Sequence, residues 1–574
     1  MVFRHERAAI KGFSRLLFPS LRGYRRAWLR GDLIAGLTVW AVLIPEALAY
    51  ASIAGVSPVV GLYAAPGALI LYAAFGSSKH LVTGPMSATA ALSAATVAEI
   101  ATGGSSHFTQ LTVALAICVG LAALIAGLAR LGFLASFISE PVLKGFIVGL
   151  ALTIVIGQVP KLFGVQAGSG DFFQKLWDLI AALGETNAAT LTVGAISLVL
   201  VLGLRRLAPE IPGSLIAVLA SVIAVKTLHL DHHGVKIVGH IASGLPSFGF
   251  PDVGLGAFGK LAAGAIGIML VGFAEGLGAA KTYAERAHYE IDVNRELIGL
   301  GSANLAAGLS SGMVVNGSLS KTAVNGSAGA NTQLSGLAVA ALTVLTLLLL
   351  TGLFEDLADA TLAAVVIAAV IELVDVAALR ALYRVSSSRL AHDYGFAARP
   401  DFIAALAAML GVLVFDTLPG LFIGISVSLL LLLYRSSRPH VAVLGQVPGA
   451  PNHFGDVERH PENLRDPETV VLRVESGLFF ANADWTRAHI LGEAAQGTVK
   501  RIVLDIETVP FIDISSAHML VSLARELRDH GVVLMLAGDV GQVRDVLRHT
   551  DAERSPIPRY ASVREALDAE QPLR

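Results

Sequence analysis

A lysine stands in a polar, glycine-rich stretch between two strongly apolar regions of the chain. The stretch is Asn316 to Asn325, "NGSLSKTAVN", and the lysine is Lys321. Gly and Ser break the incoming chain and favour the start of a new helix. A helix N-terminus leaves backbone N–H groups unpaired and carries roughly +0.5 of a charge, which makes it a site for anions. Lys321, in the first turn, would add a full positive charge.

The same pattern occurs once more, earlier in the chain. "GPMSATA" (Gly84–Ala90) matches "GSLSKTA" (Gly317–Ala323) at an offset of 233 residues, and a second match at an offset of 229 aligns Glu46 with Glu275. Two matches in the same order indicate two copies of one unit. Transporters are often built from two repeats of inverted topology whose half-helices meet near the bilayer midplane. We therefore predict one anion site between two half-helices.

The positive charge at this site would total about +2, enough for a small divalent anion. An alternative is that Lys321 reaches outward from a helix end to a lipid headgroup. The glycines, the hydroxyls and the repeat argue against that alternative.

Two carboxylates fall inside apolar runs, where a lone acid is costly and usually faces a polar cavity. These are Glu46 and Glu275. Both ionised, they would repel an anion, so at least one should be protonated or neutralised by a cation when substrate binds. We predict that they form the coupling-ion site and that protons are the coupling ion. A static pair between Glu275 and Lys321 is the structural alternative.

Composition places these residues in a membrane. Of 574 residues, 54% are hydrophobic and only 15% are charged, and the mean hydropathy is +0.67. We count about fourteen apolar runs near the length of roughly 20 residues that crosses a bilayer. Cys118 is the only cysteine, which excludes disulfides and disfavours a cysteine metal site. No cofactor, metal, nucleic-acid partner or enzymatic activity is expected.

The chain divides by composition, and its basic N-terminal flank predicts that the N-terminus lies in the cytoplasm. The predicted divisions are a cytosolic segment (1–32), a transporter domain (33–435) made of repeats 33–230 and 257–435, a Pro/Gly-rich linker (436–468) and an α/β domain (469–574). The polar insert 231–253 separates the repeats. Its pair His232 and His233 has no standard metal-ligand spacing, so we expect a solvated loop.

Three stretches resemble the SulP anion permeases, relatives of plant sulfate transporters and of prestin. They are Ser57–Leu92, Gly317–Gly336 and Val509–Leu520, and the likeness extends over nearly the whole chain. The resemblance implies a polytopic α-helical membrane protein with 7+7 spans in inverted repeats. It also implies a core domain that moves against a gate domain, a cytosolic STAS domain and a homodimer. Substrates in the family include sulfate, bicarbonate, chloride, oxalate and C4-dicarboxylates.

The resemblance also assigns residues by position. Many members have Arg at the position of Lys321 and Gln at that of Glu46, and animal relatives have an aromatic residue at Met86. The predicted anion-binding residues are Met86, Ser87, Ala88, Thr89, Leu319, Ser320, Lys321 and Thr322.

The resemblance also bears on the STAS domain. In related anti-sigma-factor antagonists a phosphorylatable serine directly follows an aspartate, and this chain has Ile514 at that position. A helix N-cap formed by Asp513 or Ser515 is favoured here.

The sequence as a whole predicts a secondary active transporter in the cell membrane that takes up a small oxyanion, first sulfate, by proton symport with alternating access. The alternatives of the same fold are a Na⁺-coupled bicarbonate or C4-dicarboxylate transporter, an anion exchanger or a channel. A membrane-tethered regulator with STAS as its working part is the alternative of another class. A sensor, however, needs no duplicated anion site.

Overall fold

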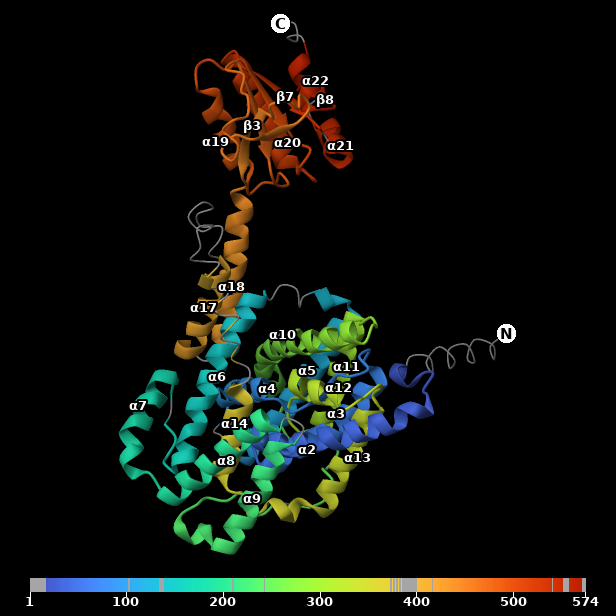
Figure 1. The fold of residues 1–574 in the computed structure, drawn as a ribbon, viewed down its shortest axis with the longest axis vertical. Helices are drawn as coiled ribbons and strands as arrows, with labels where there is room; N and C mark the ends of the chain where they lie inside the picture. Colours follow the sequence, from blue (N-terminus) through green and yellow to red (C-terminus); the bar gives the residue numbers. More distant parts are fainter. Residues whose placement is uncertain are drawn as a thin grey trace, which may run out of the picture. The chain divides into compact units, whose positions relative to one another are not determined.

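The protein, shown in Figure 1 as a computed structural model, consists of two compact units, residues 1–428 and 429–574. The structure describes residues 17–569 except 102–103, 134–138, 169, 209–210, 242, 372–373, 375–376, 378–379, 381–382, 385–399, 416, 539 and 551–556. The first sixteen residues of the predicted cytosolic segment lie outside the described part.

We call residues 1–428 the membrane unit. Its first half contains seven apolar helices, an amphipathic helix and a short strand. They are α2 (Leu29–Ile53), α3 (Pro58–Phe75), β1 (Val82–Gly84), α4 (Ser87–Ala98), α5 (Ser106–Leu128), α6 (Glu140–Phe163), α7 (Phe172–Ala182), α8 (Ala188–Leu207) and α9 (Gly213–Leu228). Local sequence sets their ends. The side chains of Ser105 and Asn187 cap α5 and α8, and Gly164 ends α6 in the left-handed conformation.

The second half repeats this order of strand and helices. It consists of α10 (Leu255–Arg286), α11 (Val293–Leu309), β2 (Asn316–Ser318), α12 (Leu319–Ser327), α13 (Leu334–Leu349), α14 (Asp359–Ile371), α17 (Pro400–Phe415) and α18 (Thr417–Ser437). Each half therefore has a short strand directly before its third spanning helix, as the sequence repeat predicts.

Among the described residues, seven helices are long and apolar enough to cross a membrane: α2, α3, α5, α6, α8, α10 and α18. Five shorter helices are also apolar, namely α4, α9, α13, α14 and α17. With α11 and the short α12 they form two sets of seven, which confirms the predicted 7+7 arrangement with two half-helices.

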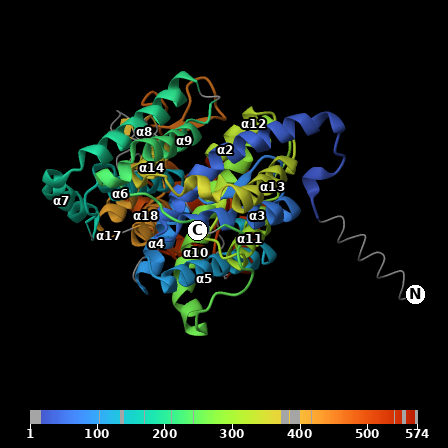
Figure 2. The ribbon, with the colours of Figure 1, turned by 90° about the horizontal axis from the view of Figure 1, so that it is seen from below.

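The helices of the membrane unit pack in two groups, which Figure 2 shows side by side. One group takes α2 to α5 from the first half and α10 to α13 from the second. The other takes α6, α8 and α9 with α14 and α17. Glycines bring neighbours within each group close. A Cβ on Gly61 would overlap the Ala47 carbonyl, and one on Gly145 would overlap the Ala405 carbonyl.

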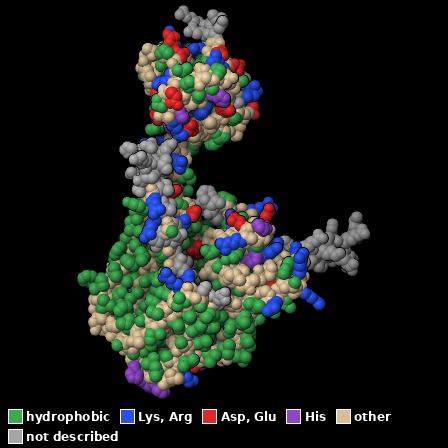
Figure 3. Space-filling view, viewed as in Figure 1, with side chains coloured by type: hydrophobic (Ala, Val, Ile, Leu, Met, Phe, Trp, Pro, Cys, Tyr) green, Lys and Arg blue, Asp and Glu red, His purple; other side chains and the backbone are tan. Residues whose placement is uncertain are grey.

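Hydrophobic side chains cover much of the face of the membrane unit that Figure 3 shows. Val199 on α8 and Ile223 on α9 are 71% and 62% exposed. So much exposed apolar surface is expected only where lipid or another protein covers it.

The second unit is a six-stranded sheet with helices. Its strands are β3 (Val441–Gln446), β4 (Phe454–Asp456), β5 (Thr469–Val474), β6 (Arg501–Asp505), β7 (Val533–Ala537) and β8 (Arg559–Tyr560), in the order β4-β3-β5-β6-β7-β8. Its helices are α19 (Ala483–Ala494), α20 (Ile514–Asp529), α21 (Gly541–His549) and α22 (Val563–Asp568). Strands β5 to β8 are parallel, whereas β3 and β4 add antiparallel neighbours. The segment predicted as a linker, 436–468, thus contains two strands of this sheet.

Candidate functional site

The two half-helices meet through the short strands that precede them. Strand β1 pairs with β2 in antiparallel register, with Thr83 opposite Gly317 and Gly84 opposite Asn316. All six strand residues are buried. Helix α4 begins at Ser87, shortly after β1, and α12 begins at Leu319, directly after β2. Two helix N-termini are therefore held near one another inside the bundle.

Lys321 lies between these two N-termini. Its side chain is only 1% exposed, so it does not reach outward to a headgroup. The ammonium group Nζ donates to Glu46 Oε2 at 2.6 Å and to the carbonyl oxygen of Pro85, just before α4, at 3.1 Å. It also lies 5.2 Å from the centre of the Tyr50 ring, in a cation–π position. The lysine of one repeat is thus bound to the helix start of the other.

The partner of Lys321 is Glu46 of α2, so the alternative of a static pair between Lys321 and Glu275 is wrong. Sequence could not decide this, because both acids occupy equivalent places in the repeat. Lys321 is further fixed through its backbone, since its N–H donates to the Ser318 side chain, the N-cap of α12. A buried charge must be paired or strongly hydrogen-bonded, and this pair satisfies that requirement.

Glu275 is in a different environment. It lies on α10, and its Oε2 atom is buried without a hydrogen-bond partner among the described residues. The next residue, Gly276, packs against β2: a Cβ there would lie 3.1 Å from Asn316 Oδ1. Glu275 is therefore close to the paired strands, yet no described residue donates to its Oε2 atom.

The remaining predicted residues differ in whether their side chains are buried or exposed. Ser87 and Thr89 in the first turn of α4 are buried, with Ala88 between them, and Met86 is its partly buried N-cap residue. In the second repeat, Thr322 Oγ1 accepts a hydrogen bond from Val82 N at 3.0 Å.

Two other residues in the first turn of α12 face away from the protein interior. Leu319 is 55% exposed and Ser320 is also exposed, with its hydroxyl 3.2 Å from that of Ser318. The structure therefore brings Lys321 and Thr322, but not the Leu319 side chain, into the interior.

Sequence reasoning missed two acids that hold the loops beside the half-helices. Asp32 accepts from the backbone N–H groups of Asn331 and Thr332 and from the Thr332 hydroxyl, at 2.6 to 3.1 Å. Glu296 accepts from Tyr72 OH and from three donors of Ser77 and Ser78. Both acids lie in first turns of helices, where a charged flank is the usual interpretation.

Two amides complete this support. Gln333 Nε2 donates to the carbonyls of Ser78 and Leu81, just before β1, and Asn325 Nδ2 donates to the carbonyl of His80. Asn325 within α12 and Gln333 after it thus fix the chain that leads into the other half-helix. Side-chain bonds of this kind pin the two helix starts in one geometry.

A small cavity lies beside the site rather than at Lys321. Its polar lining comes from Thr89, Asn304 and Asn316, and the rest is apolar. Asn304 Nδ2 donates to the carbonyls of Leu300 and Val315, and Asn304 Oδ1 accepts from Val315 N. Asn316 Nδ2, in contrast, has no hydrogen-bond partner in the described part of the chain.

Comparison with known proteins shows which family the chain belongs to. Residues 29–391 match the model of the sulfate permease family. The chain belongs to this family. A second match, to the STAS domain, covers residues 460–566.

Relatives of this sulfate permease family member cover nearly all of it. A protein named "Probable sulfate transporter" from Mycobacterium tuberculosis is 38% identical over 529 residues, 92% of each chain. High affinity sulfate transporter 1 of Stylosanthes hamata is 31% identical over 91% of this chain and 80% of its own.

Solved structures show the same fold at lower identity. Murine Solute Carrier 26 family member A9 in the inward-facing state matches with a TM-score of 0.86 and 21% identity over 98% of this chain and 94% of that one. The transmembrane domain of the cyanobacterial bicarbonate transporter BicA matches with a TM-score of 0.59 and 22% identity, over 67% and 97%.

In the STAS domain, the side chain of Asp513 caps α20 by accepting from Ser516 N at 2.8 Å, as predicted. Burial opposes ionisation, but the backbone N–H groups of Ser516 and Phe480 outweigh it and hold the pKa of Asp513 below its usual value. Ser515 is exposed on the first turn, and Ser516 is buried.

Proposed function

We propose that the protein is a secondary active transporter of a small oxyanion, with sulfate as the first candidate. The anion would bind between the N-termini of α4 and α12, at Met86, Ser87, Ala88, Thr89, Lys321 and Thr322 and at the backbone N–H groups of Leu319 and Ser320, whose side chains are exposed. The observation that carries this proposal is the buried Lys321 ammonium, 3.1 Å from the Pro85 carbonyl at the start of the opposite half-helix. Names of curated relatives as sulfate transporters support sulfate.

Charge accounting links anion binding to protons. Ionised Glu46 neutralises Lys321, which leaves roughly +1 from the two helix ends, too little for a dianion. Protonation of Glu46 would release the ammonium group and bring the total to about +2. The anion and a proton would then enter together, which is symport.

Glu275 is the second carrier of this coupling. An ionised carboxylate oxygen buried without a donor is costly, so Glu275 is best accommodated with a proton. It would lose this proton when the site opens to water. Both acids would thus respond to the proton gradient, and Na⁺ in place of the proton is the alternative coupling ion.

Alternating access would arise from movement of one helix group against the other. The two groups of Figure 2 each draw equivalent helices from both repeats, as the model of a core moving against a gate requires. The N-terminus and the STAS domain would face the cytoplasm of the cell, and two copies would form a homodimer in the membrane. The exposed apolar surface of α8 and α9 would contact lipid.

The test is uptake into liposomes that contain the purified protein. Sulfate, bicarbonate, chloride and fumarate are compared with an inward proton gradient, an inward Na⁺ gradient or neither. Accumulation of sulfate driven by the proton gradient is the expected result. Accumulation of bicarbonate or fumarate with Na⁺ would replace the proposal by the Na⁺-coupled alternative. Strict one-for-one anion exchange, or passive flux alone, would identify an exchanger or a channel, and no flux of any anion would favour a regulator.

A further inference from the structure

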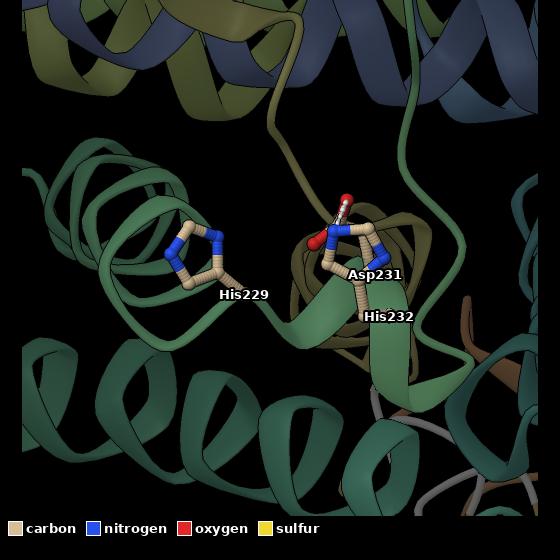
Figure 4. A group of neighbouring side chains, drawn as sticks. All are labelled: His229, Asp231 and His232. Carbon is tan, nitrogen blue, oxygen red and sulfur yellow. Dashed lines mark ion pairs between the residues drawn. The ribbon is translucent and has the colours of Figure 1, made fainter.

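Three side chains that bind transition metals meet at the end of α9 (Figure 4). His229 is the C-cap residue of α9, and Asp231 and His232 lie on the following turn, η5 (Leu230–His233). One ligand atom from each side chain lies within 4.8 Å of those of the other two. The expectation of a plain solvated loop considered only His232 and His233. Folding brings His229 and Asp231 to His232.

The backbone of this turn is fixed by its own hydrogen bonds. His232 N donates to the His229 carbonyl at 3.1 Å, and Gly234 N donates to the Asp231 carbonyl at 3.2 Å. Asn187, the N-cap of α8, donates from Nδ2 to the His233 carbonyl. The three side chains therefore project from a defined loop, which lowers the entropy that a bound ligand must remove.

The ligand atoms are accessible and weakly engaged. Asp231 and His232 side chains are 42% and 77% exposed, and their nearest approach, His232 Nε2 to Asp231 Oδ2, is 3.8 Å. The His229 and His232 rings have centres 6.1 Å apart. Within the described residues, neither imidazole forms a hydrogen bond to another group. Their nitrogen lone pairs are available to an external ligand.

We propose that His229, Asp231 and His232 bind one divalent transition-metal ion, with Zn²⁺ as the reference ion. Zinc takes imidazole nitrogen at about 2.0–2.1 Å and carboxylate oxygen at about 2.0–2.2 Å. A tetrahedral ion with such bonds holds its ligand atoms about 3.4 Å apart. Side-chain rotations that move each ligand atom by about 1 Å would therefore bring the three atoms to this spacing. Water would take the fourth position.

The ligand set also determines which ions bind. Imidazole suits Zn²⁺, Cu²⁺ and Ni²⁺, whereas Mg²⁺ and Ca²⁺ prefer oxygen ligands only. Two imidazoles and one carboxylate therefore favour transition metals over the abundant hard cations.

Metal binding here would stiffen a corner where three helices meet. Val235, directly after the turn, packs with Val225 of α9 and with Ala358, just before α14. Ile237 forms a β-bridge with Ala358. With the Asn187 bond, the turn contacts α8, α9 and the start of α14, so the bound ion should protect residues 225–241 against hydrogen exchange.

The experiment is zinc titration of the full-length protein in detergent by calorimetry, after removal of any histidine tag. We expect one Zn²⁺ per chain, no heat from Mg²⁺, and increased exchange protection of 225–241 with Zn²⁺. His229→Ala and His232→Ala should each raise the Kd at least about tenfold, or 1.4 kcal/mol. These residues are exposed, and an unchanged unfolding temperature without metal will verify the fold of each variant.

Two histidines of the same insert serve as matched controls. His233→Ala removes a neighbour whose Nδ1 contacts the His229 carbonyl, and His240→Ala removes a ring bonded to Glu355. Both variants should bind Zn²⁺ within about twofold of wild type. Unchanged affinity in His229→Ala and His232→Ala, or an equal loss in both controls, would overturn the proposal.

Discussion

The pair between Lys321 and Glu46 allows a test that separates binding from structural support. Lys321→Ala should raise the apparent Kd for the anion by one to two orders of magnitude, about 1.4 to 3 kcal/mol, as for a charge-assisted contact. The same change leaves Glu46 buried and unpaired. Breaking a buried pair on one side typically costs about 3–5 kcal/mol of stability, so loss of folding is a competing explanation.

The double variant Lys321→Ala/Glu46→Gln removes both charges. We expect it to recover most of the stability lost in the single variant, because no buried charge remains uncompensated. Its anion affinity should stay 10- to 100-fold below wild type, about 1.4 to 3 kcal/mol, because the ammonium group is absent. Glu46→Gln alone should bind the anion at least as well as wild type, since the competing carboxylate is gone.

The measurements are anion binding by calorimetry and thermal unfolding of the same detergent preparations. Lys321→Arg, which keeps the charge, should retain binding, and Lys281→Ala, which removes an exposed lysine of α10, is the matched control. Wild-type affinity in the double variant would refute the reasoning. It would mean that Lys321 only neutralises Glu46 and that the anion binds elsewhere.

Three further results are expected. Glu275→Gln, fixed in the neutral form, should still exchange sulfate in liposomes but lose stimulation by an inward proton gradient; full proton-driven accumulation by this variant would contradict its coupling role. Gly61→Ala should lower the free energy of unfolding by about 1–3 kcal/mol, because the new Cβ on α3 would overlap the Ala47 carbonyl of α2. Gly157→Ala on α6 is the control: no heavy atom of a neighbour among the described residues lies within 4 Å of the new Cβ, so the free energy of unfolding should not change. Asp513→Ala should cost about 1 kcal/mol through loss of the N-cap and speed hydrogen exchange at the start of α20, while Asp513→Ser should not.

The half-helices were predictable because their signal is local. Glycine or proline before a row of hydroxyls determines where a helix can start, and the same pattern occurs twice. The partner of Lys321 was not predictable, since Glu46 is 275 positions away and Glu275 occupies the equivalent place in the other repeat. Only the packing of α2 against α12 distinguishes them.

The linker prediction failed for a related reason. Strands β3 and β4 contain one glycine each and are flanked by Pro439, Pro448 and Pro451, and glycine and proline are turn signals within one sequence. Strand β3 forms because β5 offers an open antiparallel edge, with Val441 opposite Val474, and β4 then pairs with β3. Pairing partners distant in sequence, rather than local preference, decide such segments.

Four acids in the membrane unit differ in what their carboxylates contact, and this difference separates structural from functional roles. Asp32 and Glu296 accept from backbone N–H and hydroxyl groups that cannot leave, so their charge is permanently compensated. Glu46 instead pairs with the ammonium group of Lys321, and the Oε2 atom of Glu275 has no donor among the described residues. A buried ion pair is seldom more stable than apolar residues of the same size, so stability does not explain the choice of Glu46 and Lys321. A charge that can be released when a proton or an anion arrives does explain it, and it requires the arrangement seen here: a carboxylate paired with a cation that an anion could also bind.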